Sequence, residues 1–158
     1  SDNNRIMGDD AAWDADGWAC GVSSGNLRFT KNGIVDADAD PQATVPANEW
    51  AHVAISVSST DGLKYYVNGQ PVGTNADTAD MNTGLGNNGV DDPYAVGRGY
   101  GNLQDQWFAG SLDDVRVYDE VLTDGAVAEL ARVPEPGSLA LASLAMVLGL
   151  AAVRRRNR

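Results

Sequence analysis

Two adjacent carboxylates, Asp113 and Asp114, are the residues of this sequence best placed to hold a cation. They lie within residues 107–118, where the alternation of a β-strand slips by one position: Leu112 and Val115 are both expected inside but fall on opposite faces. A β-bulge would explain the slip and turn one carboxylate inward, where it needs a cation or several hydrogen bonds. Two alternatives stay open: a structural Ca²⁺ site, or carboxylates that accept backbone N–H groups or pair with Arg116.

Other acidic residues offer oxygen ligands without a complete metal-binding motif. The run Asp36-Ala37-Asp38-Ala39-Asp40 begins like an EF-hand loop, but Pro41 stands where that loop needs glycine and Ala47 where it needs glutamate. We therefore expect a solvated acidic loop at residues 36–40. Asp14 and Asp16 could contribute oxygens to a hard cation. Calcium is the one cofactor that the sequence suggests, and its candidate ligands remain Asp113 and Asp114.

Four aromatic residues in or beside predicted loops could form a platform for a sugar ring: Trp13, Tyr94, Tyr100 and Trp107. Trp50 begins a predicted strand, so we expect it in the core. Tyr65 and Tyr66 are neighbours in another strand and must point to opposite faces, which predicts that one of them is exposed.

The sequence gives no support for catalysis. Cys20 and His52 are the single cysteine and the single histidine, and both lie in strand-like runs. Nucleophile-elbow and phosphate-loop motifs are absent, so we expect no catalytic residue and no enzyme. Residues 1–132 contain 21 acidic and 7 basic residues, a net charge of −14, which argues against a nucleic-acid partner.

The first 132 residues read as short strands separated by turns. Residues 49–58 alternate between apolar and polar side chains, and Asn68-Gly69 between two apolar runs is a strong hairpin signal. Ser24-Gly25-Asn26, between the runs 18–23 and 27–31, suggests another hairpin. Residues 75–93 are rich in Asn, Asp and Gly and read as a long loop. The predicted strands are residues 18–23, 27–31, 49–58, 63–67, 70–74, 94–98 and 107–118.

One short helix is predicted to follow these strands. Thr123 suits the N-cap position, and Asp124 in the first turn complements the helix dipole. Val127 and Leu130 are three residues apart and can face a sheet together.

The C-terminal segment has a different character. Val133-Pro134-Glu135-Pro136 interrupts the preceding helix, residues 139–153 are almost all apolar, and Arg154, Arg155, Arg156 and Arg158 follow. At about 1.5 Å per residue the apolar run would span roughly 22 Å, short of a bilayer core of about 30 Å. The terminal arginines can reach the cytoplasmic face, so we expect this run to insert into a membrane as a separate helix.

The order and spacing of several motifs in the body resemble the laminin-G-like, or concanavalin-like, domains. These motifs are Glu49-Trp50-Ala51-His52-Val53-Ala54, Tyr65-Tyr66-Val67-Asn68-Gly69 and Phe108-Ala109-Gly110-Ser111-Leu112-Asp113-Asp114-Val115-Arg116-Val117-Tyr118. The resemblance implies an all-β, two-sheet antiparallel jelly roll over residues 1–132, and an N-terminus that lacks strands which complete domains carry. It further predicts an inner layer formed by Val53, Ile55, Val57, Val67, Leu112, Val115 and Val117.

The tail, residues 133–158, resembles the PEP-CTERM sorting signal. Pro134, Glu135 and Pro136, the apolar run and the arginine cluster Arg154, Arg155 and Arg156 stand in that family's order. The resemblance implies recognition by an exosortase-type transpeptidase in the inner membrane of a Gram-negative bacterium. Removal of the tail would then deliver the body to the cell surface or the exopolysaccharide matrix.

Three hypotheses for the body follow: a surface adhesion or binding module, a carbohydrate-binding accessory domain of a larger secreted hydrolase, or a structural spacer. The partner of such a module would be a polysaccharide or a surface protein.

Overall fold

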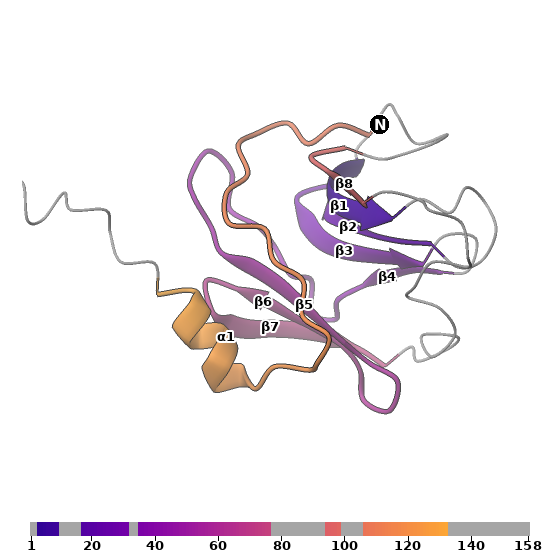
Figure 1. Ribbon diagram of the computed structural model, residues 1–158, viewed down its shortest axis with the longest axis vertical. Coiled ribbons are helices and arrows are strands. Elements are labelled where there is room, and N and C mark those ends of the chain that lie inside the picture. Colours follow the sequence, from indigo (N-terminus) through magenta and orange to yellow (C-terminus); the bar gives the residue numbers. More distant parts are fainter. Residues whose placement is uncertain (1–2, 10–16, 32–34, 77–93, 99–105, 133–158) are drawn as a thin grey trace, which may run out of the picture.

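The computed structural model describes residues 3–9, 17–31, 35–76, 94–98 and 106–132 of the chain (Figure 1). These residues form two antiparallel sheets and one short helix, α1 (Asp124–Leu130), which confirms the predicted all-β jelly-roll sandwich. Sheet A has the order β4-β3-β2-β1-β8 and sheet B the order β5-β6-β7. The strands are β1 (Asn3–Asp9), β2 (Trp18–Ser23), β3 (Asn26–Lys31), β4 (Val35–Asp38), β5 (Val53–Ser58), β6 (Gly62–Val67), β7 (Gln70–Asn75) and β8 (Tyr94–Val96).

Both predicted hairpins are present, and their turns have the backbone that their residues favour. The β2–β3 turn places Ser24 at φ 50° and Gly25 at φ 80°, and the β6–β7 turn places Asn68 at φ 51° and Gly69 at φ 74°. Positive φ at both central residues matches the right-handed twist of the flanking strands.

The acidic loop predicted at residues 36–40 is wrong, because residues 35–38 form strand β4. Asp36 and Asp38 point to solvent while Ala37 and Ala39 are buried, which is the alternation of an edge strand packed on one face. The alanines, which carry the inward half of this pattern, are small and gave little hydrophobic signal in the sequence.

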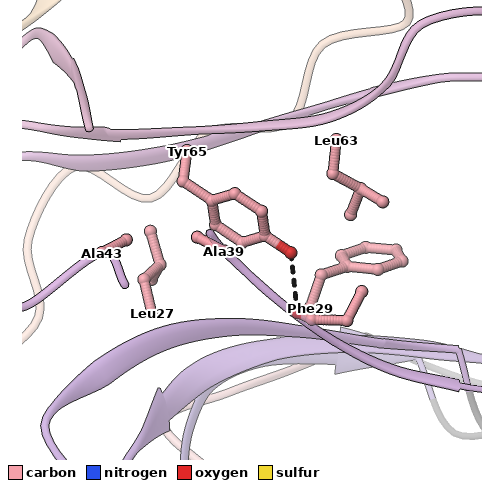
Figure 2. Packing of buried hydrophobic residues seen from close by; sticks show 7 residues of the cluster. Leu27, Phe29, Ala39, Ala43, Leu63 and Tyr65 are labelled. Atoms are coloured by element: carbon pink, nitrogen blue, oxygen red, sulfur yellow. Dashed lines mark hydrogen bonds between the residues drawn. The ribbon is translucent and has the colours of Figure 1, made fainter. Parts of the chain in front are cut away.

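The core lies between the sheets and is centred on one aromatic side chain (Figure 2). Tyr65 of β6 is fully buried against sheet A, and its hydroxyl donates a 2.7 Å hydrogen bond to the carbonyl oxygen of Ala37. Burial raises the pKa of Tyr65 well above its usual value, so this hydroxyl stays protonated and remains a donor. The remaining core residues are Leu27, Phe29, Ala39, Ala43 and Leu63.

The two sheets are joined by backbone hydrogen bonds along one side. The N–H of Asp40 donates to Thr74 O at 2.8 Å and the N–H of Thr74 donates to Asp40 O at 3.2 Å. The chain after β4 is therefore tied to β7, and the sandwich is closed on that side.

On the opposite side of the sandwich, the structure differs from the prediction made from the sequence. Residues 107–118 were expected as a strand, but residues 106–123 form no strand, and Val115 and Val117 are 39% and 59% exposed. Trp50, expected in the core, is 71% exposed, and the inward valines and isoleucine of β5 are only half-buried. A strand needs a neighbour to satisfy its backbone groups, and no described strand lies along residues 107–118.

Helix α1 packs on the face of sheet B that points away from sheet A. Thr123 caps it as predicted, accepting a 3.2 Å hydrogen bond from the N–H of Ala126, and Val127 is buried while Leu130 is half-buried. Asp124 accepts hydrogen bonds from Lys64 Nζ at 2.7 and 2.8 Å and from the Tyr66 hydroxyl at 2.9 Å. The helix therefore covers Tyr66, so Tyr65 and Tyr66 point to opposite faces as predicted, but neither is exposed.

We predict that Gly69→Ala destabilises the body more than Gly25→Ala does. Both glycines have positive φ, so both substitutions incur the same backbone strain of about 1 kcal/mol. A Cβ at Gly69 would also lie 2.8 Å from Ala131 Cβ and 3.0 Å from Ala128 Cα, whereas a Cβ at Gly25 meets nothing within 4 Å.

Urea unfolding of the two variants measures the difference, which should be about 1–3 kcal/mol for the helix contact. Equal free energies of unfolding for the two variants would show that α1 does not pack closely on the β6–β7 turn.

Candidate functional site

The aromatic candidate Tyr94 lies on β8, at the edge of sheet A. Its side chain is 57% exposed, and its ring contacts Trp18 in a tilted arrangement with a centroid distance of 6.1 Å. Trp18 in turn stacks on the core residue Phe29 at 6.0 Å. Tyr94 is thus the exposed end of an aromatic row that starts in the core, and the contact with Trp18 restricts the orientation of its ring.

Trp107, the second described candidate, lies close to the end of β8. The N–H of Phe108 donates a 2.9 Å hydrogen bond to Gly97 O, which holds the segment after Trp107 beside β8. Trp107 is 58% exposed, and the guanidinium of Arg98 lies 5.8 Å from the centre of its ring. This is a cation–π contact that combines an exposed aromatic face with N–H donors. Trp13 and Tyr100 lie outside the described residues.

The candidate metal ligands Asp113 and Asp114 are both exposed. Asp113 Oδ1 accepts a 2.9 Å hydrogen bond from the N–H of Asp114, which has φ 52°. Arg116 donates from Nε and Nη2 to the two carboxylate oxygens of Asp114, both at 2.8 Å. Asp114 would have to exchange this bidentate partner for a cation, and calcium binding here stays a prediction.

The described ranges contain no group of three or more His, Cys, Asp or Glu side chains arranged to hold a metal ion. At Asp113-Asp114, where the alternation slips, the structure has an irregular segment in which Asp114 adopts a left-handed backbone conformation. The predicted β-bulge is wrong, because these residues do not lie in a strand.

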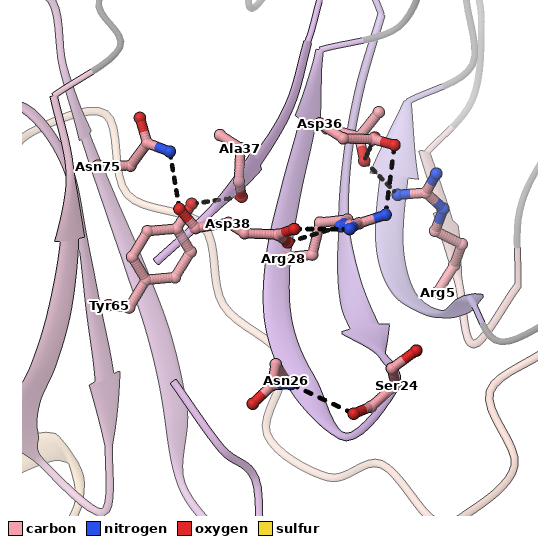
Figure 3. A network of polar contacts seen from close by, with 10 residues as sticks. Arg5, Ser24, Asn26, Arg28, Asp36, Ala37, Asp38, Tyr65 and Asn75 are labelled. Atoms are coloured by element: carbon pink, nitrogen blue, oxygen red, sulfur yellow. Dashed lines mark hydrogen bonds and ion pairs between the residues drawn. The ribbon is translucent and has the colours of Figure 1, made fainter. Parts of the chain in front are cut away.

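Sequence reasoning missed a polar network on the outer face of sheet A (Figure 3). Arg28 of β3 donates to Asp38 of β4 through Nε at 2.7 Å and Nη2 at 2.6 Å, and its Nη1 lies 3.3 Å from Asp36. The hydrogen bonds that Arg28 donates to the Asp38 carboxylate raise the pKa of Arg28 further above its usual value. The sequence did contain a signal for this network. Arg28 and Thr30 are two positions apart on β3, Asp36 and Asp38 are two positions apart on β4, and the register pairs Arg28 with Asp38 and Thr30 with Asp36.

The network continues to a buried cation on β1. Arg5 is 5% exposed and donates to the Thr30 hydroxyl at 2.8 Å and to Gln106 Oε1 at 2.7 Å, while Thr30 donates to Asp36 at 2.7 Å. Burial lowers the pKa of Arg5, and the nearby charge of Asp36 opposes that shift. Gln106 thereby fixes the beginning of residues 106–123 to sheet A.

Cys20 and His52 lie in different parts of the sandwich. Cys20 is in β2 of sheet A, where burial raises the pKa of its thiol to about 11, so the thiol is a poor nucleophile at neutral pH. His52 directly precedes β5 of sheet B, and its backbone exchanges hydrogen bonds with Asn68 at 2.7 and 3.0 Å.

The residues of the sorting signal, Pro134, Glu135, Pro136, Arg154, Arg155 and Arg156, lie outside the described residues, as does the apolar run at residues 139–153. Among the described elements, no helix is long and apolar enough to cross a membrane.

We predict that the body loses stability as the pH falls through about 6.5, the pKa that His52 regains in the unfolded chain. Burial lowers the pKa of His52 in the folded chain, and its Nδ1 has no hydrogen-bond partner among the described residues. Between the two pKa values the unfolded chain binds more protons, so the free energy of unfolding rises with pH there.

Urea unfolding between about pH 5 and 7 tests this, because no other side chain of ordinary pKa titrates in that window. His52→Gln should flatten the pH dependence. A variant that keeps the wild-type slope would assign the slope to other groups.

Comparison with known proteins places the two parts of the chain. The sequence profile of the Concanavalin A-like lectin/glucanases superfamily, in its laminin-G-type group, matches residues 1–128. The profile of the PEP-CTERM protein-sorting motif matches residues 132–156. No match was found among curated proteins.

One solved structure is similar to the chain, that of an S-layer domain-containing protein from Clostridium thermocellum. The two share 20% identity with a TM-score of 0.46, and the match covers 82% of this chain and 63% of that one. The chain thus spans less than two thirds of the structure it matches. With the superfamily profile covering the whole sandwich, the chain belongs to the laminin-G-type concanavalin A-like superfamily and carries a PEP-CTERM protein-sorting motif behind its β body.

Proposed function

We propose that this chain is an exported cell-surface or exopolysaccharide-matrix protein whose laminin-G-like body is a binding or adhesion module. The observation that carries the proposal is the position of the sorting motif, which starts at residue 132, directly after α1 ends at Leu130. The last fully buried residue described in the body is Val127. Removal of the tail behind residue 132 therefore leaves the packed core intact.

In this proposal the tail acts as a temporary anchor. Residues 139–153 insert into the inner membrane of a Gram-negative cell with Arg154, Arg155 and Arg156 on the cytoplasmic side. An exosortase-type enzyme then recognises Pro134, Glu135 and Pro136 and releases the body. The net charge of −14 on residues 1–132 supports solubility of the released body outside the cell.

The body itself acts by binding and not by catalysis. Its one thiol is held protonated, and its carboxylates at Asp36, Asp38, Asp114 and Asp124 are engaged by Arg28, Arg116, Lys64 and the Tyr66 hydroxyl. These four carboxylates are structural, and the exposed aromatic side chains are the feature that we propose a ligand contacts.

A second candidate function is a carbohydrate-binding accessory domain of a larger secreted hydrolase. The exposed rings of Tyr94 and Trp107 beside β8 favour it, because flat aromatic faces next to hydrogen-bond donors suit sugar rings.

Sorting is tested by changing Pro134, Glu135 and Pro136 to Ala in the source bacterium. We expect loss of surface delivery and retention of the arginine-terminated peptide, both measured by mass spectrometry of surface and membrane fractions. The matched control changes three exposed residues of the body, Gln42, Glu49 and Gln70, to Ala and should be delivered normally. Normal delivery of the triple tail variant, or a mature surface protein that still ends in Arg158, would contradict the proposal.

The aromatic platform is tested on a glycan array with Tyr94→Ala and Trp107→Ala. If the body binds a sugar there, each substitution should weaken binding about tenfold, because exposed aromatic anchors carry much of the energy of such contacts. Trp50→Ala is the matched control, an exposed tryptophan beside sheet B. A glycan signal that Trp50→Ala lowers equally, or no signal at all, would count against this platform.

A further inference from the structure

Helix α1 ends very close to the triplet Pro134-Glu135-Pro136 of the sorting motif. Only Arg132 and Val133 separate this triplet from Ala131, the C-cap residue of the helix. The N–H of Ala131 donates to Val127 O and the N–H of Arg132 donates to Glu129 O, both at 3.1 Å. The backbone is therefore engaged in the helix up to residue 132, where the motif begins.

The helix is too short to persist without its contacts to sheet B. It has seven residues, whereas isolated helices shorter than about 12 residues are marginal in water. Its contacts are the buried side chain of Val127, the bonds of Asp124 to Lys64 and Tyr66, and close packing against Gly69. Release of α1 from sheet B therefore also unfolds the helix, so the docked helix and the open segment are two alternative states.

The C-terminal end of α1 has little stabilisation of its own. Its last turn contains no basic residue and includes Glu129, whose charge opposes the negative end of the helix dipole. Ala131 keeps a right-handed helical backbone, so the left-handed glycine that ends many helices is not used. Pro134 disfavours helical backbone at the residue before it, which limits the helix to residues up to 132. The end of α1 nearest the triplet is thus the part that opens most readily.

Enzymes that cut or exchange a peptide bond bind the substrate in an extended conformation, with residues on both sides of that bond. An extended stretch across the triplet includes Arg132 and Ala131, and their N–H groups are occupied while α1 is docked. We propose that α1 controls the rate of tail removal, because the exosortase-type enzyme can bind the chain only after the last turn of α1 has left sheet B. This inference rests on the sorting function proposed above.

The stability of α1 on sheet B then sets how long the body stays anchored. When a segment opens and closes faster than it is cut, the rate of cleavage follows the population of the open state. A substitution that favours the docked helix lowers that population and slows processing, and a substitution that weakens docking raises the population and speeds processing. The regulation is contained in the fold and needs no further ligand.

Two substitutions in α1 change the docked population in opposite directions. Gly125→Ala favours the helix, and the added Cβ would lie 4.0 Å from Thr123 Oγ1, an ordinary contact distance. We expect processing to slow about twofold to fivefold. Val127→Ala removes two buried methyl groups from the contact with sheet B and should speed processing about tenfold.

The rates are measured on the full chain in the source bacterium. After a pulse of isotope label, mass spectrometry follows the loss of the arginine-terminated chain with time. The matched control is Val57→Ala, which removes the same atoms from β5 on the face directed at sheet A and should leave the rate unchanged. Hydrogen–deuterium exchange of the purified full chain in mild detergent measures α1 directly: its amides should exchange more slowly in Gly125→Ala and faster in Val127→Ala.

A second set of chains carries Gly-Ser-Gly-Ser between Arg132 and Val133. The added residues let the enzyme bind an extended stretch while α1 stays docked. In this background wild type, Gly125→Ala and Val127→Ala should be processed at one common rate, at least as fast as the wild type without the insertion.

Three results would overturn control by α1 and leave the sorting proposal intact. The first is unchanged processing in the two α1 variants although their exchange differs. The second is unchanged exchange in α1, and the third is an effect of the two substitutions that persists with the insertion, which would assign it to general stability. Failure of the wild-type chain to lose its tail under any condition would instead contradict the sorting proposal, and control by α1 with it.

Discussion

The hydrogen bond between the Tyr65 hydroxyl and the Ala37 carbonyl crosses the space between the two sheets, and much of the body is arranged around it. A tyrosine buried this deeply must satisfy its hydroxyl, and an unmade bond of this kind costs about 1–3 kcal/mol. Room for the ring comes from Ala37, Ala39 and Ala43, which are all small. Since Ala37 and Ala39 face inward, alternation turns Asp36 and Asp38 outward, where Arg28 binds them. The core contact and the surface network are thus two faces of one strand.

The fold was predictable to the extent that local patterns reported it. Asn68-Gly69 and Ser24-Gly25 identified their hairpins because a preference for positive φ depends only on the local residues. Thr123 identified the helix start because N-capping is also a local interaction. Strand β4 was not predicted, because the buried residues at this strand are alanines and give little hydrophobic signal. Residues 107–118 show the converse error, a strand that was predicted but is not formed. Val115 and Val117 have the alternation of a strand, but a strand also requires a neighbouring strand, which the pattern of one segment cannot reveal.

The sequence predicted which kinds of residue form the candidate site better than it predicted how those residues are arranged. The exposure of Tyr94 and Trp107 followed from their positions beside loops, but the row that joins Tyr94 to Phe29 through Trp18 depends on the register of β1, β2, β3 and β8. Similarly, Arg5 and Gln106 are 101 positions apart and meet only because sheet A brings the segment after β8 back to β1. Long-range pairs of this kind leave no signature in either segment alone.

The place where the chain leaves the body has a mechanical consequence. Any pull on the polypeptide beyond Arg132 reaches α1 before it reaches a strand, and α1 is attached to sheet B through Asp124, Lys64 and Tyr66 and through its close contact with Gly69. Asp124 lies in the first turn of the helix and Gly69 lies against Ala128 and Ala131 at its end, so a load is shared between contacts at both ends of the helix. A load on the chain beyond Arg132 would therefore have to break these helix contacts before it reached the ladder between β6 and β7.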